Sequence, residues 1–451
     1  MLKPIHDQGD ALLPTSTASL SASSLSASLN PQAATRARST RRKLLKLSAS
    51  VIGASSLAAP FVSRAQNKPI KIGMPTILSG RVAMLGISSS NAAKMEVEKF
   101  NAAGGLNGRP IELVIRDSKG QPQEAARVAR ELVTADGCEL LLDAEASSGA
   151  FAVHEVARDL GVLVMHTNSE TSALTADPKL RVPTAFRSAR QGIHDAVVGG
   201  AYAAQVAKEK GLRRWMSVSP DYAYGRDTTA EFLEYLKYFN KDIEVTGQVW
   251  PKLFQADYSE IITRLLQGKP QAIYSALWGG DLTSFMDQAN IYALFKDRQF
   301  FAVNMADYAV LTAVKSVPAN LHSGNRYLRS FPNTAANHQW SDAYAAKFKE
   351  LPLNWSWENA VGMQLLIAAM RKANSTDSKK MAEVLRGLSI DSPFGAEGKI
   401  TMRAEDHTVI NYAVGWGALA TKEPYMANPV AGSWKQILEL EAAWKKSKGW
   451  A

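Results

Sequence analysis

The sequence contains a single cysteine, Cys138, among its 451 residues. One cysteine cannot form an intramolecular disulfide and cannot supply a cysteine-based metal site, so both kinds of stabilisation are excluded. Cys138 stands in the apolar run CELLL, where a buried and unreactive thiol is the expected state.

Motifs typical of several enzyme classes are also missing. The sequence has no G-x-x-x-x-G-K-[ST], no H-E-x-x-H and no G-x-S-x-G. The glycines of GGLNG at 104–108 follow a predicted helix and precede a predicted strand, the reverse of the order that a dinucleotide site needs. His154, His166 and His194 lack a ligand-like spacing and are expected to be structural. We therefore expect no catalytic residues, no metal and no cofactor.

Long apolar runs and blocks of one charge are absent as well. The stretch 44–62 is interrupted by Ser and Gly and falls short of the ~20 strongly apolar residues of a spanning helix. The formal net charge is +10, but the basic residues are spread along the chain, so nucleic-acid binding is not expected.

The N-terminal residues have the composition of an extension and an export signal. Residues 1–39 are rich in Ser and Ala and are predicted to be disordered or to precede the true start. Residues 40–65 combine the twin arginines Arg41 and Arg42, an apolar stretch and small residues, which predicts a twin-arginine signal cleaved after Ala65. Residues 1–65 hold eight Lys/Arg and two Asp/Glu, so the mature chain is near +4 and is expected in the periplasm.

The mature chain alternates predicted strands with predicted helices. Apolar strand-like runs begin at Pro69, Ile111, Cys138 and Gly161, and a second set begins at 213, 243, 271 and 299. Helical patterns such as 258–267 and 282–293 separate them. Strands alternating with helices predict an α/β fold, and a chain longer than the ~250–300 residues of a single core favours two doubly wound lobes. In such sheets ligands bind beyond the carboxyl ends of the strands, which is where HTNSETSALT at 166–175 lies.

Several motifs, taken in order, resemble one family. IGMPTILSGRVAMLG, NAAGGLNGRPIELVIRDSKGQPQEAARVARELV, EASSGAF, TNSETSALT, AFRSARQ, DYAYGRD, DYSEIITRL and SPFGAEGKITMRAEDHTV occur between about residues 70 and 416. This series resembles the branched-chain amino acid (Leu/Ile/Val) type of periplasmic substrate-binding protein of ABC transporters, the type I periplasmic binding protein fold. The resemblance implies two lobes joined by three hinge crossings, which close on a ligand between them. On its pattern the N-terminal lobe takes 69–187 and 279–392, and the C-terminal lobe takes 188–278 and 393–451.

The resemblance also places ligand contacts on the first lobe. Ser79 falls in the family's Leu-Ser-Gly loop, and Leu85 replaces an aromatic residue that covers the ligand. Ser148, with Ser147 beside it, corresponds to a Ser that binds the ligand carboxylate; a Ser here can also cap the following helix, and one residue can do both.

The family's Ala-Thr pair, which holds both charged ends of an amino acid, falls on Ser169 and Glu170. A carboxylate at Glu170 would repel a ligand carboxylate and attract an ammonium or another hydrogen-bond donor. The alternative is that Glu170 is a loop charge turned to solvent.

On the second lobe the resemblance indicates Tyr224, with Tyr222 as a competitor for the same role. The family's acidic contact to the ligand ammonium falls near Gln255, which is neutral, while Asp257 is expected to cap the next helix. Trp278 precedes Gly279 and Gly280 at an expected hinge and either stacks on the ligand or packs in the core. Trp355 and Trp357 lie near the position of a cleft-edge aromatic.

These expectations describe a monomeric binding protein that captures a small-molecule solute, an amino acid or a related amide or carboxylate. Its partner is expected to be the membrane permease of an ABC importer. Two alternatives remain: a sensor that presents its closed form to a membrane receptor, and an exported α/β enzyme.

Overall fold

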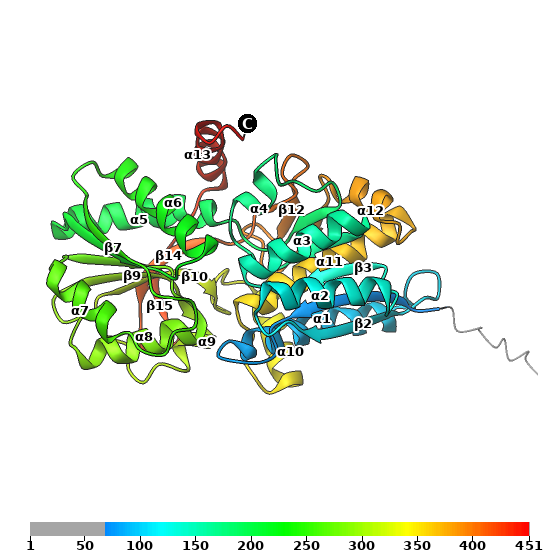
Figure 1. Ribbon diagram of the computed structural model, residues 1–451, viewed down its shortest axis with the longest axis horizontal. Coiled ribbons are helices and arrows are strands. Elements are labelled where there is room, and N and C mark those ends of the chain that lie inside the picture. The colour runs from blue at the N-terminus through cyan, green and yellow to red at the C-terminus, as the bar shows by residue number, and fades with distance from the viewer. Residues whose placement is uncertain (1–67, 451) are drawn as a thin grey trace, which may run out of the picture. The chain divides into compact units, whose positions relative to one another are not determined.

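The computed structural model describes residues 68–450 of the chain (Figure 1). The predicted extension, 1–39, and the predicted export signal, 40–65, lie outside the described residues. Within 68–450 no helix is long and apolar enough to cross a membrane.

The first lobe is built on a five-stranded parallel sheet in the order β2-β1-β3-β4-β5. Ile70, Ile72 and Met74 of the second strand in this order are fully buried, as expected for a parallel sheet with helices on both faces. The strands are β1 (Ile70–Thr76), β2 (Ile111–Asp117), β3 (Leu140–Asp143), β4 (Leu163–His166) and β5 (Ala185–Arg187).

Two pairs of helices cover this first sheet. One pair, α1 (Ala83–Ala102) and α11 (Asn354–Ala373), packs together, and the other pair, α2 (Pro122–Thr134) and α3 (Ser147–Leu160), does the same. The lobe also contains the short helices α4 (Ala173–Ala176) and α12 (Ser378–Leu385), and α10 (Ala335–Phe348), which contacts α1.

The second lobe is built on a seven-stranded mixed sheet in the order β15-β14-β10-β9-β8-β6-β7. Strands β6 to β10 run parallel, whereas β14 and β15 are antiparallel additions at one edge. The strands are β6 (Arg214–Val218), β7 (Glu244–Val249), β8 (Ala272–Ser275), β9 (Gln299–Asp307), β10 (Leu321–Tyr327), β14 (Gly415–Leu419) and β15 (Met426–Ala431).

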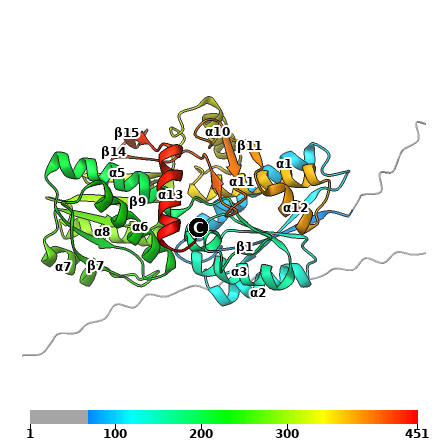
Figure 2. The ribbon, with the colours of Figure 1, turned by 90° about the horizontal axis from the view of Figure 1, so that it is seen from above.

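Figure 1 shows helices above and below this second sheet. The upper layer pairs α5 (Gly192–Lys210) with α6 (Ala223–Phe239), and the lower layer contains α7 (Ser259–Gly268), α8 (Gly279–Ile291) and the short α9 (Tyr308–Leu311). The C-terminal helix α13 (Trp434–Ser447) packs against α5, as Figure 2 shows from above.

Three chain crossings connect the lobes. The first follows β5 and the second follows β10. The third lies between β14 and a small antiparallel sheet of β11 (Ser389–Asp391), β12 (Lys399–Met402) and β13 (Val409–Ile410). A bridge between Arg187 and Thr408 links β5 to the segment just before β13, which brings the first and third crossings together.

The lobe boundaries expected from the sequence need correction at two places. Residues 279–392 were expected in the N-terminal lobe, but in the second sheet β9 pairs in parallel with β8 and β10 pairs in parallel with β9, and α8 packs on β9, so all three belong to the second lobe. Gly279 and Gly280 begin α8 and are not a hinge. Residues 393–451 were expected in the C-terminal lobe, but β12 and β13 form the small sheet with β11, and only β14 onward joins the second sheet.

Candidate functional site

A cavity lies between the two lobes, at the carboxyl ends of the parallel strands of both sheets. The space there that protein atoms do not fill is about 470 Å³, including the part that is open to solvent. Its lining comes from the ends of strands and the first turns of helices in both lobes: Leu85, Ala146, Ser147, Asn168, Glu170, Tyr222, Tyr224, Trp278, Gly279, Asn304, Asp307, Arg326, Asn354 and Trp355. This is the position in which open α/β sheets bind ligands.

The first-lobe wall is a network of hydroxyl and amide groups. Ser147 begins α3, and its hydroxyl accepts hydrogen bonds from the hydroxyls of Ser169 (3.1 Å) and Thr171 (2.9 Å). Ala146 and Ser147, at the N-terminus of α3, line the cavity, and no side chain caps this end of the helix. Asn168 donates to Glu358 at 3.1 Å and accepts from Asn359 at 3.0 Å, which fixes its orientation.

The second-lobe wall contains two tyrosines and an amide. The side chain of Asn304, near the end of β9, donates to the Tyr224 hydroxyl at 2.9 Å and to the carbonyl of Leu277 at 3.0 Å. The Tyr222 and Tyr224 rings are 5.9 Å apart, and burial raises the pKa of both phenols. Both phenols are therefore neutral at physiological pH.

An aromatic surface spans the cleft. Trp278, before α8 of the second lobe, stacks on Trp355, at the start of α11 of the first lobe, with ring centroids 5.8 Å apart. Gly279 has a φ of +50°, and a Cβ at this position would lie 3.3 Å from Leu85. Glycine therefore permits the close approach of α8 to α1 across the cleft.

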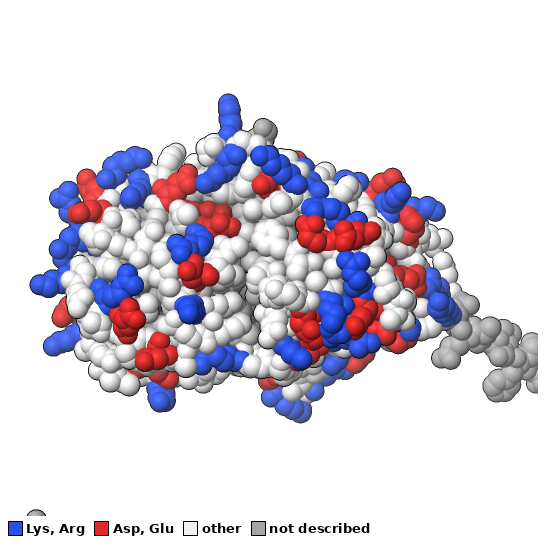
Figure 3. Space-filling model, in the orientation of Figure 1, with Lys and Arg blue, Asp and Glu red and all other residues white. Residues whose placement is uncertain are grey.

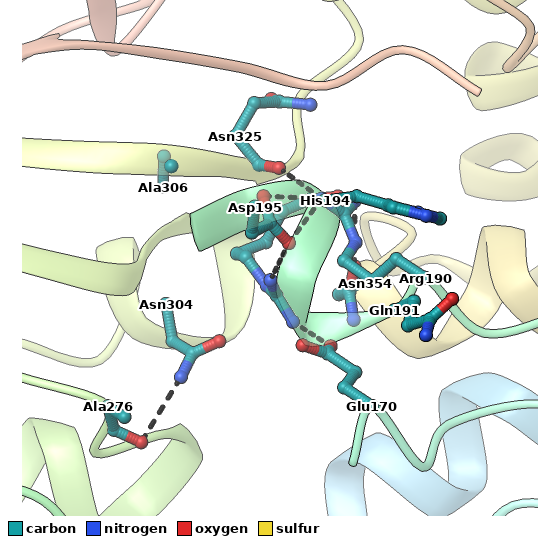
Figure 4. Close-up of polar contacts among 12 residues, drawn as sticks. Glu170, Arg190, Gln191, His194, Asp195, Ala276, Asn304, Ala306, Asn325 and Asn354 are labelled. Atoms are coloured by element: carbon teal, nitrogen blue, oxygen red, sulfur yellow. Dashed lines mark hydrogen bonds and ion pairs between the residues drawn. The ribbon is translucent and has the colours of Figure 1, made fainter. Parts of the chain in front are cut away.

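A buried cluster of charges crosses the cleft beside this surface. Arg326, at the end of β10, pairs with Glu170 of the first lobe, and its other terminal nitrogen lies 2.9 Å from Asp195. Figure 4 shows Glu170 and Asp195 pointing toward the same guanidinium from opposite sides. The cluster continues through Arg190 to Glu358.

The electrostatics of the cluster are dominated by burial. Burial raises the pKa of Asp195 and lowers the pKa of Arg326 to about 10, so the guanidinium stays charged at neutral pH. Asp307 accepts backbone hydrogen bonds from Ala309 (3.2 Å) and Asn354 (3.3 Å), yet burial still raises its pKa to about 6.

The structure brings five of the predicted site residues to the cavity: Leu85, Ser147, Glu170, Tyr224 and Trp278. Glu170 is buried and not turned to solvent. Tyr222 and Tyr224 both line the cavity. Of the two candidate cleft-edge tryptophans, Trp355 lines it and Trp357 does not.

The other four predicted residues do not line the cavity, and their contacts explain why. Ser79 is exposed on the loop after β1. Ser148 follows Ser147 on α3 and is half-buried, whereas Ser169 points to the Ser147 hydroxyl. Gln255 closes its own turn, accepting from the amide of Lys252 and donating to the carbonyl of Asp257.

Sequence reasoning missed Asn304, Asp307, Arg326 and Asn354. Asn304 and Asp307 end a strand that was predicted, so the rule applied to HTNSETSALT would have found them. Arg326 ends β10, whose sequence LHSGNRY has little of the apolar pattern that predicts a buried strand.

The comparison with known families agrees with this geometry. The family described as periplasmic binding protein matches residues 69–414. The chain belongs to this family. Its members are solute-binding proteins and not enzymes, and membership implies a periplasmic location.

Two relatives illustrate the similarity in sequence. The leucine-, isoleucine-, valine-, threonine- and alanine-binding protein of Pseudomonas aeruginosa is 24% identical over 331 residues, which cover 73% of this chain and 85% of that protein. The Leu/Ile/Val-binding protein of Escherichia coli is 23% identical over 342 residues, covering 76% and 89%.

Solved structures of binding proteins share the fold. A solute-binding protein of an ABC transporter from Rhodopseudomonas palustris, in complex with 3,4-dihydroxybenzoic acid, superposes with a TM-score of 0.72 at 21% identity, covering 80% of this chain and 96% of that one. The branched-chain amino acid binding protein LivJ of Streptococcus pneumoniae, in complex with isoleucine, gives 0.69 at 20% identity, covering 81% and 100%.

Proposed function

We propose that this periplasmic binding protein captures an amino acid, or a related amide or carboxylate, between its lobes and delivers it to the permease of an ABC importer. The observation that carries the proposal is the interlobe cavity, in which a polar wall faces the stacked Trp278 and Trp355. A ligand with a small polar head and an apolar body suits such a cavity.

The wall residues have distinct roles in this proposal. Ser147 and the free N–H groups at the start of α3 receive an oxygen of the ligand head. Glu170 and Tyr224 offer an acceptor and a hydroxyl, while Leu85 and the two indoles cover the apolar body. Because these groups come from both lobes, the ligand makes all its contacts only in the closed form.

The comparisons support both ligand classes. The sequence relatives are named for binding branched-chain and other small amino acids, whereas several structural neighbours contain benzoates. Both classes combine a carboxylate with an apolar body.

A thermal-shift screen of residues 66–451 against amino acids, amides, and aliphatic and aromatic carboxylates tests the proposal. A ligand at 100 times its dissociation constant stabilises the protein by about 2.7 kcal/mol. Trp355→Ala is expected to abolish the shift. Trp250→Ala, the same substitution at a tryptophan that stacks on Arg226 and does not line the cavity, is expected to keep it. No shift with any class, after removal of bound ligand by unfolding and refolding, would contradict the proposal.

We also propose an export route, a cleavage position and an oligomeric state for this protein. Export follows the twin-arginine route, with cleavage after Ala65, and the mature protein is a monomer. Replacing both Arg41 and Arg42 by Lys is expected to block export, and N-terminal sequencing of the exported protein is expected to begin at Gln66. Light scattering of the purified protein checks its oligomeric state.

A further inference from the structure

The carboxylate of Glu170 forms an ion pair with the guanidinium of Arg326, the group to which a ligand carboxylate would otherwise be expected to bind. Arg326 is the only Lys or Arg among the described residues that line the cavity. One of its terminal nitrogens pairs with Glu170 and the other lies 2.9 Å from Asp195. The side chains of Arg326 and Glu170 are 2% and 5% exposed, so water does not screen their interaction.

The charges around this pair have an excess of acid. Arg190 shares Asp195 with Arg326, at 3.4 Å, and its Nε lies 3.6 Å from Glu358. Asp307 also lines the cavity. Two guanidinium groups thus face the carboxyl groups of Glu170, Asp195, Asp307 and Glu358. Burial raises the pKa values of Asp195, Asp307 and Glu358, and this outweighs the opposite effect of the nearby Arg190.

We infer that Glu170 sets the charge preference of the site, favouring solutes with a cationic or N–H-donating head over solutes whose head is only a carboxylate. The inference rests on the proposed function. A benzoate-like ligand whose carboxylate binds Arg326 would have to displace Glu170 and leave that carboxylate buried without its partner, and one whose carboxylate faces Ser147 offers no N–H donor to Glu170. An ammonium or amide head donates to Glu170 while the pair with Arg326 stays intact.

Glu170 therefore takes the place at Arg326 that a ligand carboxylate would otherwise take. An amino acid remains a suitable ligand, because its ammonium faces Glu170 while its carboxylate faces Ser147 at the start of α3. An aromatic or aliphatic acid without a nitrogen is disfavoured, although its apolar body fits against Trp278 and Trp355.

The test compares carboxylate and amide pairs of the same shape: benzoate with benzamide, and isovalerate with isovaleramide, alongside L-leucine. Calorimetric titration of ligand-stripped wild type is expected to show tighter binding of the amides than of the matched carboxylates. Glu170→Gln keeps the side-chain size and removes the charge. It is expected to shift the carboxylate-to-amide affinity ratio toward the carboxylate by at least tenfold.

Two further variants test whether the change in affinity ratio comes from the Glu170–Arg326 pair and not from the loss of any carboxylate. Glu98→Gln removes a carboxylate from an exposed ion pair with Lys347 and is expected to leave the ratio unchanged. Adding Arg326→Gln to Glu170→Gln is expected to reverse the gain for carboxylates, because the freed guanidinium is what binds them. Melting curves establish that each variant is folded.

The outcomes distinguish the two proposals. An unchanged ratio in Glu170→Gln, or its failure to bind either carboxylate, overturns the role of Glu170 while amide or amino acid binding by wild type leaves the solute-binding function standing. Binding of none of these compounds, nor of any in the wider screen, to any of the proteins overturns both.

Discussion

Asp307 and His322 are buried side chains whose pKa values move in opposite directions. Burial raises the pKa of Asp307 from 3.8 to about 6. Burial lowers the pKa of His322 from 6.5 to about 4, although Tyr202 and Gln299 lie within hydrogen-bond distance of its ring nitrogens. In both cases the folded state disfavours the charged form. Each residue therefore makes the free energy of unfolding depend on pH.

Asp307→Asn tests the first slope. Between pH 4 and 6 folded wild type binds more protons at this position than the unfolded chain, so its stability falls as pH rises through this window. An asparagine oxygen in the position of Oδ1 lies within hydrogen-bond distance of both backbone N–H groups, and the amide does not titrate. We expect wild type to lose stability relative to the variant by up to about 1.4 kcal/mol per pH unit between pH 4 and 6, and not above. Parallel urea curves for the two proteins over this range would contradict the raised pKa.

His322→Gln tests the opposite slope. Here the unfolded chain binds the proton first, so wild type loses stability as pH falls from 6.5 to about 4. The melting temperature of wild type is expected to drop more steeply than that of the variant over this interval. Equal slopes would show that His322 is not held neutral by burial.

The sequence correctly placed individual residues at the cavity where they follow a predicted strand, and was less successful elsewhere. Glu170 and Trp278 follow apolar runs, so their place at the cavity follows from the ends of parallel strands. Gln255 was placed by family position alone, and a local turn holds it away. That Arg326 pairs with Glu170 could not be predicted, because two residues 156 positions apart meet only once both lobes are assembled.

At the scale of elements, α11 brings its first turn to the cavity because it packs closely on the first sheet. Gly362 in this helix permits the approach: a Cβ there would lie 2.8 Å from the Ser188 hydroxyl and 2.9 Å from a methyl group of Thr167. Asn354 and Trp355, two turns earlier, are thereby held at the cavity edge.

Gly362→Val is expected to destabilise the protein, because its added atoms overlap Ser188 and Thr167 in a closely packed layer. Overpacking of this kind costs roughly 1–3 kcal/mol. Lys372→Val, an exposed position on the same helix, controls for the helix propensity of valine and is expected to cost about 0.5 kcal/mol. Equal urea midpoints for the two variants would contradict the close packing of α11.

The eight strands expected from apolar runs all form. The inner ones, such as β3 and β8, are buried throughout, as parallel strands covered on both faces are, whereas the edge strands β2 and β7 are only partly buried. Strands β10, β14 and β15, which form one side of the second sheet, were not expected. They carry Asn, Arg and Gly at positions where a buried strand usually has branched apolar residues, so tertiary pairing decides their structure.

At the scale of the whole molecule, contacts across the cleft define the closed form. Charged residues of both signs are interspersed over the face shown in Figure 3, so no large field of one sign marks a polyanion surface there. The position of the second crossing, after β10, could not be predicted from the sequence. It depends on which strands pair with one another, and a local sequence pattern does not show this.

Small-angle scattering tests closure. A ligand that contacts both lobes is expected to reduce the radius of gyration of ligand-stripped wild type, because it stabilises the form in which the lobes meet. Trp278→Ala, which removes half of the aromatic surface, is expected to show a smaller change at the same ligand concentration. A radius that does not respond to a bound ligand would show that binding does not need closure.

Calorimetric titration of ligand-stripped residues 66–451 with the strongest compound from the thermal-shift screen tests directly whether the interlobe cavity is the solute site. One site per chain is expected, with binding lost in Trp355→Ala and retained in Trp250→Ala. Binding that Trp355→Ala leaves unchanged would contradict the assignment of the interlobe cavity as the solute site.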